Sequence, residues 1–416
     1  MRKPKRSAYE AALSVLTTLR DGGHTALFAG GCVRDRLLGR IPKDYDIATD
    51  ATPDRVLALF PRGRSVGAQF GVILVRSFGH DIEVATFRSD GNYSDGRRPD
   101  AVTFGSAEQD ALRRDFTING LFLDPLEDRV IDYVLGQDDL KSQVIRTIGD
   151  PMLRFGEDHL RMLRAVRFAS ILSFAIAERT LAAIQSLAPR LTAISPERIW
   201  MELDDMLSSP TRAESWRLLV RTGLCDHLVQ DWKPTAKDHE LVIRRISHLP
   251  HEPRDATVAL GALLLDESDA TAAQIAGALR LSNRQHDALV WIVRSVPRLY
   301  NHEGLELADL KLLMADPGWL YAVELFKADL LARGAALTTY AGLVERAGRI
   351  PPDSITPPPL LTGADLIARG VQPGRPFGDI IKQVYRAQLN DVIALREEAL
   401  ALADELVSKI VNGRTD

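Results

Sequence analysis

The sequence has little of three things that mark special classes of protein: cysteine, long apolar runs, and an excess of charge of one sign. Its 416 residues include only two cysteines, Cys32 and Cys225, too few for a disulfide framework or a cysteine-rich metal site. We expect both to be reduced thiols in a cytoplasmic protein. No run reaches the roughly 18 apolar residues of a membrane span. The formal net charge of −4 argues against a wholly basic nucleic-acid binder but leaves room for a local basic groove.

What the sequence does contain is the composition of a folded protein, 45% hydrophobic and 26% charged. Its length suits about two to four domains. The opening segment, MRKPKRSAYEAALSVL, is basic. It leads into an amphipathic stretch rather than a continuous apolar core, so we expect no secretory signal peptide.

Periodicity changes near residue 150. Before it, short β-branched runs alternate with turns and helical stretches, as in TALFAG, GVILVR, IEVATF and RVIDYV; this is typical of a mixed sheet that carries helices. After it, apolar residues recur at three- and four-residue spacing almost throughout, which indicates helices. A proline-rich segment at 349–363 precedes a last helical unit. We predict an α+β head followed by an all-α remainder.

Two aspartates stand two positions apart in GRIPKDYDIATD, residues 39–50. On a β-strand, Asp44 and Asp46 would project to one face, where two carboxylates repel each other unless a cation lies between them. Magnesium takes such oxygen ligands and shares the rest of its shell with substrate phosphates. A solvated strand end is the alternative, because a bare Asp-x-Asp is a short and common pattern.

The preceding segment, LFAGGCVRDRLLG, favours the metal hypothesis. An apolar run leads into Gly30 and Gly31, and a helical pattern begins at once, so backbone N–H groups at a helix N-terminus would face an anion. Arg34 and Asp35 would serve a triphosphate and brace the loop. A phosphate cradle followed by a carboxylate pair supplies both parts of a two-metal nucleotidyl transfer, in which one ion activates the attacking hydroxyl and the other neutralises the leaving pyrophosphate.

These residues resemble a known family. LFAGGCVRDRLLGRIPKDYDIAT is similar to the first motif of the class II tRNA nucleotidyltransferases and bacterial poly(A) polymerases, members of the DNA polymerase β superfamily. Four further motifs follow in order: RRDFTING, DYVLGQDDL, EDHLRMLRAVRF and ISPERIWMELDDML. The resemblance implies an α+β nucleotidyltransferase head with a small mixed sheet at 1–150, a helical neck with a base-recognition helix at 151–225, a helical body at 226–348, and a tRNA-binding helical tail at 349–416.

The resemblance also implies roles for residues of the head. Glu83 in IEVATFR is a candidate third catalytic carboxylate, because the family's sheet brings this strand beside the aspartate pair; an exposed strand residue is the alternative. Arg114, Asp115 and Asn119 of the second motif would line the sugar and phosphate side of the nucleotide.

Two neighbouring positions carry weaker expectations. We interpret Arg113 as a solvated residue with no part in the site. Gly120 stands where the second motif commonly continues with alanine. Because both residues are small, we expect this departure to have little effect.

The fourth motif bears on base choice. On one continuous helix, Glu157, Arg161 and Arg164 would follow at steps of four and three on one flank, with Asp158 three residues before Arg161. Surface ion pairs are the alternative. In the family, the matching Asp and Arg read the incoming base. Cytosine and adenine each present an exocyclic amine beside a ring-nitrogen acceptor, whereas uracil and guanine would leave both protein groups unpaired, at about 1–3 kcal/mol each.

The loop at 87–102 bears on the product. It is full length, and Asp95, Arg97 and Arg98 are its candidate functional residues. In the family, a full-length loop favours addition of the whole CCA end. The sequence therefore predicts a magnesium-dependent enzyme that adds C and A from CTP and ATP to the 3′ end of tRNA. An A-adding or CC-adding relative, a poly(A) polymerase, and a non-catalytic RNA-binding protein remain open alternatives.

Overall fold

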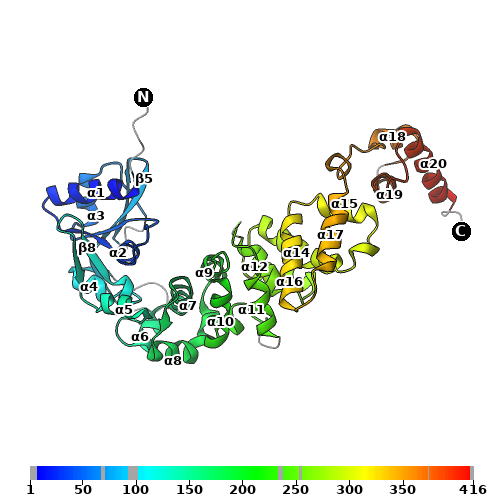
Figure 1. The fold of residues 1–416 in the computed structure, drawn as a ribbon. Helices are drawn as coiled ribbons and strands as arrows, with labels where there is room; N and C mark the ends of the chain where they lie inside the picture. The colour runs from blue at the N-terminus through cyan, green and yellow to red at the C-terminus, as the bar shows by residue number, and fades with distance from the viewer. Residues whose placement is uncertain are drawn as a thin grey trace. The chain divides into compact units, whose positions relative to one another are not determined.

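The computed structural model describes residues 7–66, 71–91, 102–232, 238–252, 255–372 and 374–412. The chain divides into two compact units, Met1–His239 and Glu240–Asp416. All strands among the described residues belong to the first unit, at the blue-to-green end of the chain, and the second unit is helical (Figure 1). Within these described ranges, no helix combines the length and apolar character that crossing a membrane requires.

The main sheet of the first unit is built from β1 (Ala26–Ala29), β2 (Asp46–Thr49), β3 (Arg64–Ser65), β4 (Val72–Ser77), β5 (His80–Thr86), β8 (Leu121–Asp124) and β9 (Arg129–Asp132). Their order across the sheet is β3-β4-β5-β2-β1-β8-β9. β2 and β5 are parallel and the other neighbours antiparallel, so the sheet is mixed. Two short pairs lie outside it: β6 (Arg88–Asp90) with β7 (Val102–Phe104), and β10 (Val144–Ile145) with β11 (Ala175–Ile176).

The burial of the strands follows from their residues. All four residues of β1, ALFA, and of β8, LFLD, are buried, as expected for strands at the centre of a covered sheet. In β5, buried Ile82, Val84 and Thr86 alternate with residues on the opposite face, where Glu83 is exposed. Ile47 of β2 pairs in parallel with Val84 of β5. The residues just before this pair, Asp46 at the start of β2 and Glu83 in the middle of β5, therefore lie beside each other.

Helices of the first unit cover the sheet and continue beyond it. They are α1 (Ala8–Asp21), α2 (Gly31–Leu37), α3 (Pro53–Leu59), α4 (Ala107–Leu112), α5 (Gly136–Ser142), α6 (Pro151–Glu157), α7 (Leu160–Leu172), α8 (Glu178–Leu187), α9 (Pro196–Leu207) and α10 (Arg212–Thr222), with 3-10 turns η2 (Thr117–Asn119), η3 (Ala188–Ala193) and η4 (Leu224–His227). α1 packs against β1, β2, β4 and β5, and α2 against β1 and β8. α7 packs against α9 and α10, which joins the fourth motif to the fifth.

The second unit consists of helices: α11 (His239–Ser247, whose first residue belongs to the first unit), α12 (Ala256–Leu263), α13 (Asp269–Ala278), α14 (Asn283–Leu299), α15 (Leu307–Met314), α16 (Trp319–Ala332), α17 (Thr338–Gly348), α18 (Gly363–Ala368), α19 (Arg375–Leu389) and α20 (Arg396–Asn412), with turns η6 (His302–Gly304) and η7 (Pro352–Ser354). The helices after the proline-rich segment have a hydrophobic core of their own, centred on Leu366, Ile380 and Val384.

The predicted fold class is confirmed: a mixed sheet with helices, then an all-helical remainder. The domain limits at residues 150, 225 and 348 stay predictions. Cys32 and Cys225 are both buried free thiols.

The expectation that glycine in place of alanine at position 120 has little effect stays a prediction, but in this chain the position is closely packed. A Cβ at residue 120 would lie 2.6 Å from Val134 Cγ2 and 3.1 Å from Ile148 Cδ1. We predict that Gly120→Ala lowers the free energy of unfolding by about 1–3 kcal/mol, since overpacking forces neighbours to shift. Denaturant unfolding of Gly120→Ala, Val134→Ala and the double variant checks this. If the clash is the cause, the double variant loses less stability than the sum of the single losses; a simple sum would contradict it.

Candidate active site

A cleft of about 500 Å³ in the first unit gathers residues from four of the five motifs. This volume is within the usual range for small-molecule sites. Six of its lining residues are arginines and three are aspartates, a balance that suits a polyanionic ligand. The lining residues are Gly30, Gly31, Arg34, Asp46, Arg113, Arg114, Asp115, Asn119, Asp158, Leu160, Arg161, Arg164, Phe168 and Arg198.

One of the three candidate carboxylates lines this cleft. β2 begins at Asp46, so the prediction that Asp44 lies on the strand is wrong: Asp44 is in the segment before it. Asp44, Asp46 and Glu83 are all exposed, and of the three Asp46 lines the cleft. Desolvation and the negative charge of Glu83 raise the pKa of Asp46 to about 6, with a smaller contribution from Asp44. The three carboxylates are therefore close enough to repel one another, although Arg114 offsets part of the repulsion.

This donor set fits a hard divalent cation. Carboxylate oxygens that repel one another are stabilised by a cation, and magnesium is usually held by one or two carboxylates together with substrate phosphates. Among the described residues, no three His, Cys, Asp or Glu side chains form a group that could hold a metal by themselves. A two-carboxylate site at Asp44 and Asp46 agrees with both statements, and a ligand role for Glu83 stays a prediction.

The glycine turn shapes the next part of the cleft. Gly30 has φ +70°, where L side chains are strained, and its N–H donates to the carbonyl of Leu121 at 3.0 Å. A Cβ at residue 30 would lie 2.8 Å from Arg114 Nη1. α2 begins at Gly31, so the N-terminus of this helix is at the cleft. Only glycine lets the Arg114 guanidinium approach the turn this closely.

We predict that Gly30→Ala raises the KM for nucleoside triphosphate about tenfold or more, because the new methyl group displaces the Arg114 guanidinium. Steady-state kinetics measures the change. Gly23→Ala is the matched control, since Gly23 also has a positive φ, +82°, but an added Cβ there meets no atom within 4 Å. If Gly30→Ala and Gly23→Ala raise the KM equally, backbone strain alone explains the weaker binding of the nucleotide.

Two arginines of the second motif share one buried carboxylate. Arg113 donates to Asp110 Oδ1 at 2.8 and 2.6 Å, and Arg114 donates to Asp110 Oδ2 at 3.2 and 2.9 Å. Burial alone would raise the pKa of Asp110, but the two guanidinium groups outweigh it and hold that pKa below its ordinary value. Arg113 is 20% exposed and lines the cleft. The interpretation of Arg113 as a solvated residue is therefore wrong.

Asp115 lies at the centre of the polar network. Its carboxylate accepts from Arg164 at 2.7 Å, from Asn119 Nδ2 at 3.0 Å and from the N–H of Phe116 at 2.8 Å. Asn119 Oδ1 in turn accepts from Arg34 Nη1 at 2.8 Å. The first, second and fourth motifs are thus connected through one buried carboxylate.

The ionisation of Asp115 should make stability depend on pH. Burial would raise its pKa, but Arg164 and the hydrogen bonds outweigh burial and lower the pKa to about 2. A depressed carboxyl pKa stabilises the folded state above pH 4, and this contribution is lost as the pH falls toward 2. We predict that the difference in unfolding free energy between wild type and Asp115→Asn shrinks by about 1 kcal/mol between pH 6 and pH 3. Urea unfolding at the two values checks this, and a constant difference would contradict it.

Residues of the third motif hold the turns next to the second motif in place. Asp132 accepts from the N–H groups of Val134, Gly136 and Gln137 at 3.0, 3.0 and 2.9 Å, and so shapes the turn into α5. Thr117 Oγ1 donates to the buried Asp139 of α5 at 2.7 Å, which fixes the η2 turn. These contacts position the residues around Asn119, although Asp132, Thr117 and Asp139 do not themselves line the cleft.

The fourth motif is not one continuous helix, contrary to the prediction. α6 ends at Glu157 and α7 begins at Leu160, and Asp158 between them has extended backbone angles. The physical reason is the Asp158 side chain, whose Oδ1 accepts from the N–H of Leu160 at 3.0 Å, as a helix-capping residue does. Its Oδ2 accepts from Arg198 Nη2 of α9 at 2.6 Å. The break turns Asp158 into the cleft lining.

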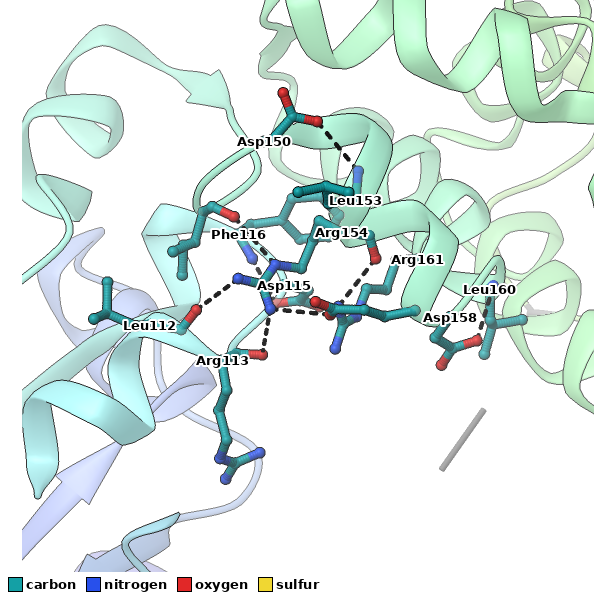
Figure 2. A network of polar contacts seen from close by, with 12 residues as sticks. Leu112, Arg113, Asp115, Phe116, Asp150, Leu153, Arg154, Asp158, Leu160 and Arg161 are labelled. Atoms are coloured by element: carbon teal, nitrogen blue, oxygen red, sulfur yellow. Dashed lines mark hydrogen bonds and ion pairs between the residues drawn. The ribbon is translucent and has the colours of Figure 1, made fainter. Parts of the chain in front are cut away.

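Arg161 pairs with Glu157 across this break, the contact that the alternative interpretation as ion pairs had expected. Its Nη1 donates to Glu157 Oε2 and, at 3.1 Å, to the carbonyl of Arg154. Figure 2 shows Arg161 near the centre of this network, with Asp158 next to Leu160 at the start of α7. Arg161 and Arg164 both line the cleft, whereas Glu157 lies behind Arg161 and does not.

Sequence reasoning missed several residues of the site. Arg198 stands in the fifth motif, and its Asp158 partner is 40 positions away, so no local spacing links them. Phe168, the last residue of the fourth motif, was not singled out, and the guanidinium groups of Arg34 and Arg164 lie over its ring at 5.1 and 5.2 Å. Asp110 could have been found, because it precedes Arg113 and Arg114 at helical spacing.

The predicted loop residues Asp95, Arg97 and Arg98 lie outside the described residues. Their role in the change from C to A stays a prediction.

Comparison with known proteins agrees with this geometry. Residues 26–146 match the model of the "Poly A polymerase head domain", and residues 173–235 match that of the "Probable RNA and SrmB- binding site of polymerase A". The CCA-adding enzyme of Geobacillus thermodenitrificans is 47% identical over 221 residues, 53% of this chain. That match spans 54% of the relative, about half its length.

Other relatives match over nearly the whole chain. The CCA-adding enzyme of Pediococcus pentosaceus is 33% identical over 95% of this chain and 96% of its own. The crystal structure of the Bacillus stearothermophilus CCA-adding enzyme in complex with CTP has a TM-score of 0.77 and 30% identity, and covers 98% of this chain and 100% of that one. The chain therefore belongs to the family of CCA-adding enzymes that share the poly(A) polymerase head domain.

Proposed function

We propose that this protein is a template-independent nucleotidyltransferase that adds C and A from CTP and ATP to the 3′ end of tRNA and releases pyrophosphate. The observation that carries the proposal is the composition of one cleft. Asp46 lines it together with six arginines, and an aspartate and an arginine of the fourth motif, Asp158 and Arg161, line the same cleft and would read the base. The CCA-adding enzyme relatives support the assignment.

Different residues would bind the triphosphate and the metal. Arg34, Arg114 and Arg164 would hold the triphosphate and sugar, each kept in place by an acid or amide partner. Asp44 and Asp46 would hold magnesium, which when bound activates the attacking 3′-hydroxyl and neutralises the leaving pyrophosphate.

Base selection would come from Asp158 and Arg161. The contacts of Asp158 with Leu160 and Arg198 use two of the roughly four acceptor positions of a carboxylate, so it can still accept from an exocyclic amine. Arg161 would donate to the adjacent ring nitrogen. Uracil and guanine present a carbonyl and a ring N–H at these places, and each unpaired group costs about 1–3 kcal/mol. C and A are thereby selected without a nucleic-acid template.

The helical remainder would bind the acceptor stem and 3′ end of the tRNA. The match of residues 173–235 to an RNA-binding region supports this part of the proposal. We also infer a cytoplasmic location, on the cysteine content and sequence features alone.

The test uses purified protein with Mg²⁺ and three tRNA transcripts, ending at the discriminator base, after CC, and after CCA. Each is incubated with CTP, ATP or both, and products are resolved at single-nucleotide length. We expect three residues to be added to the first transcript and the reaction to stop at CCA. Addition only to the CC-ending transcript, a stop after two residues, or a ladder of A would identify an A-adding, CC-adding or poly(A) enzyme. No extension at all would refute the enzyme hypothesis.

A further inference from the structure

Arg154 of α6 makes an unusually complete set of contacts outside the cleft. Its Nε donates to the carbonyl of Ile148 at 3.1 Å, Nη2 to the carbonyl of Leu112 at 2.8 Å, and Nη1 to the carbonyl of Arg113 at 3.3 Å and to Glu157 Oε2 at 3.0 Å. The side chain is 15% exposed. Figure 2 shows it pointing from the neck toward Leu112 and Arg113. All three guanidinium nitrogens therefore have acceptors.

These contacts join two parts of the site that are distant in sequence. Leu112 is the last residue of α4 and Arg113 its C-cap, so a cation here satisfies carbonyls at the negative end of the helix. The next two residues, Arg114 and Asp115, line the cleft. On the other side, Arg154 pairs with Glu157, and its backbone carbonyl accepts from Arg161 Nη1 at 3.1 Å.

Arg161 is thus fixed twice through Arg154. Glu157, the carboxylate partner of Arg161, accepts from the Arg154 guanidinium. The second acceptor for Arg161 is the main-chain carbonyl of Arg154. Arg154 does not itself line the cleft. A displacement of α6 relative to the end of α4 would move Arg161 relative to Arg114 and Asp115. The base would then meet the Arg161 guanidinium at a different place. The contacts to the triphosphate would persist.

We propose that Arg154 is a positioning residue for base selection, which sets the place of Arg161 relative to the second motif. The proposal rests on the proposed function. It requires arginine specifically, because a planar guanidinium can donate to four acceptors on three segments, whereas lysine has a single nitrogen. Removing the bridge should impair the choice among bases more than the binding of the common triphosphate.

The test compares kcat/KM for CTP and UTP on a discriminator-ending tRNA transcript in wild type, Arg154→Lys and Arg154→Gln. We expect the CTP-to-UTP ratio to fall about tenfold, mainly through a lower value for CTP. Arg179→Lys is the control, because Arg179 is 83% exposed and forms a long ion pair, at 3.7 Å, with Asp150, the N-cap of the same helix. Thermal unfolding shows which variants are folded. Two substitutions of different chemistry are used so that the comparison can still be made if one variant fails to fold.

A mutant cycle separates positioning from general support. If Arg154 acts through Arg161, Arg154→Lys causes no further loss of selectivity in an Arg161→Ala background. An unchanged CTP-to-UTP ratio in the folded variants, with both rates reduced equally, would overturn the positioning role and leave the proposed function intact. A wild type that incorporates no nucleotide would instead refute the proposed function, and this inference with it.

Discussion

Replacing Asp46 by alanine is expected to lower the rate of nucleotide incorporation by about 10³-fold or more. Asp46 lines the cleft, and desolvation together with the negative charges of Glu83 and Asp44 raises its pKa, although Arg114 offsets part of the effect. Its loss would remove one of the two carboxylates proposed to hold the metal, a contribution of several kcal/mol to transition-state stabilisation. Single-turnover primer extension with CTP and Mg²⁺ measures the effect.

Asp81→Ala is the matched control for this loss. Asp81 is on the same strand as Glu83 and is exposed, but it pairs with Arg76 at 2.7 Å instead of facing the cleft. We expect its incorporation rate to stay within about twofold of wild type, since surface pairs contribute little. A tenfold or smaller loss in Asp46→Ala would show that the reacting metal is held elsewhere.

Asp158→Asn is expected to shift base preference from C toward U by about 10- to 100-fold in the ratio of kcat/KM values. The amide keeps an oxygen that can accept from the N–H of Leu160, so the start of α7 is preserved. It also brings an N–H donor to a place where the carboxylate could only accept. A donor suits the carbonyl of uracil and leaves the amine of cytosine unpaired.

Asp150→Asn tests whether any substitution at a helix N-cap in this region shifts the base preference from C toward U. Asp150 caps α6 by accepting from Met152 and Leu153 at 2.9 and 3.2 Å, and it does not line the cleft. Parallel CTP and UTP kinetics on the two variants separates the explanations. The assignment of Asp158 to base reading fails if both variants keep the wild-type preference, or if both lose it alike.

The sequence was informative where chemistry is local. The glycine turn, Asp46, and Arg114 and Asn119 of the second motif all line the cleft, as predicted. Each belongs to a short segment whose residue types already restrict what it can bind. Periodicity likewise separated the mixed-sheet head from the helical remainder, because strands and helices have different side-chain repeats.

The sequence was less informative where one side chain depends on a distant partner. The break between α6 and α7 was missed because the repeat of apolar residues runs through EDHLRMLRAVRF, although aspartate is a known cap residue and offered a signal. Arg198 was not singled out, since its pairing with Asp158 arises only when α7 packs on α9. Arg113 was misread because the burial of Asp110 cannot be seen from spacing alone.

A crystal structure of the protein with CTP and Mg²⁺ tests the site assignment most directly. We expect the Watson–Crick edge of cytosine against Asp158 and Arg161, the triphosphate among Arg34, Arg114 and Arg164, and the metal on Asp46. Cytosine bound away from Asp158 and Arg161, or a metal that Asp46 does not contact, would contradict the assignment of base reading to the first two residues and of metal binding to Asp46.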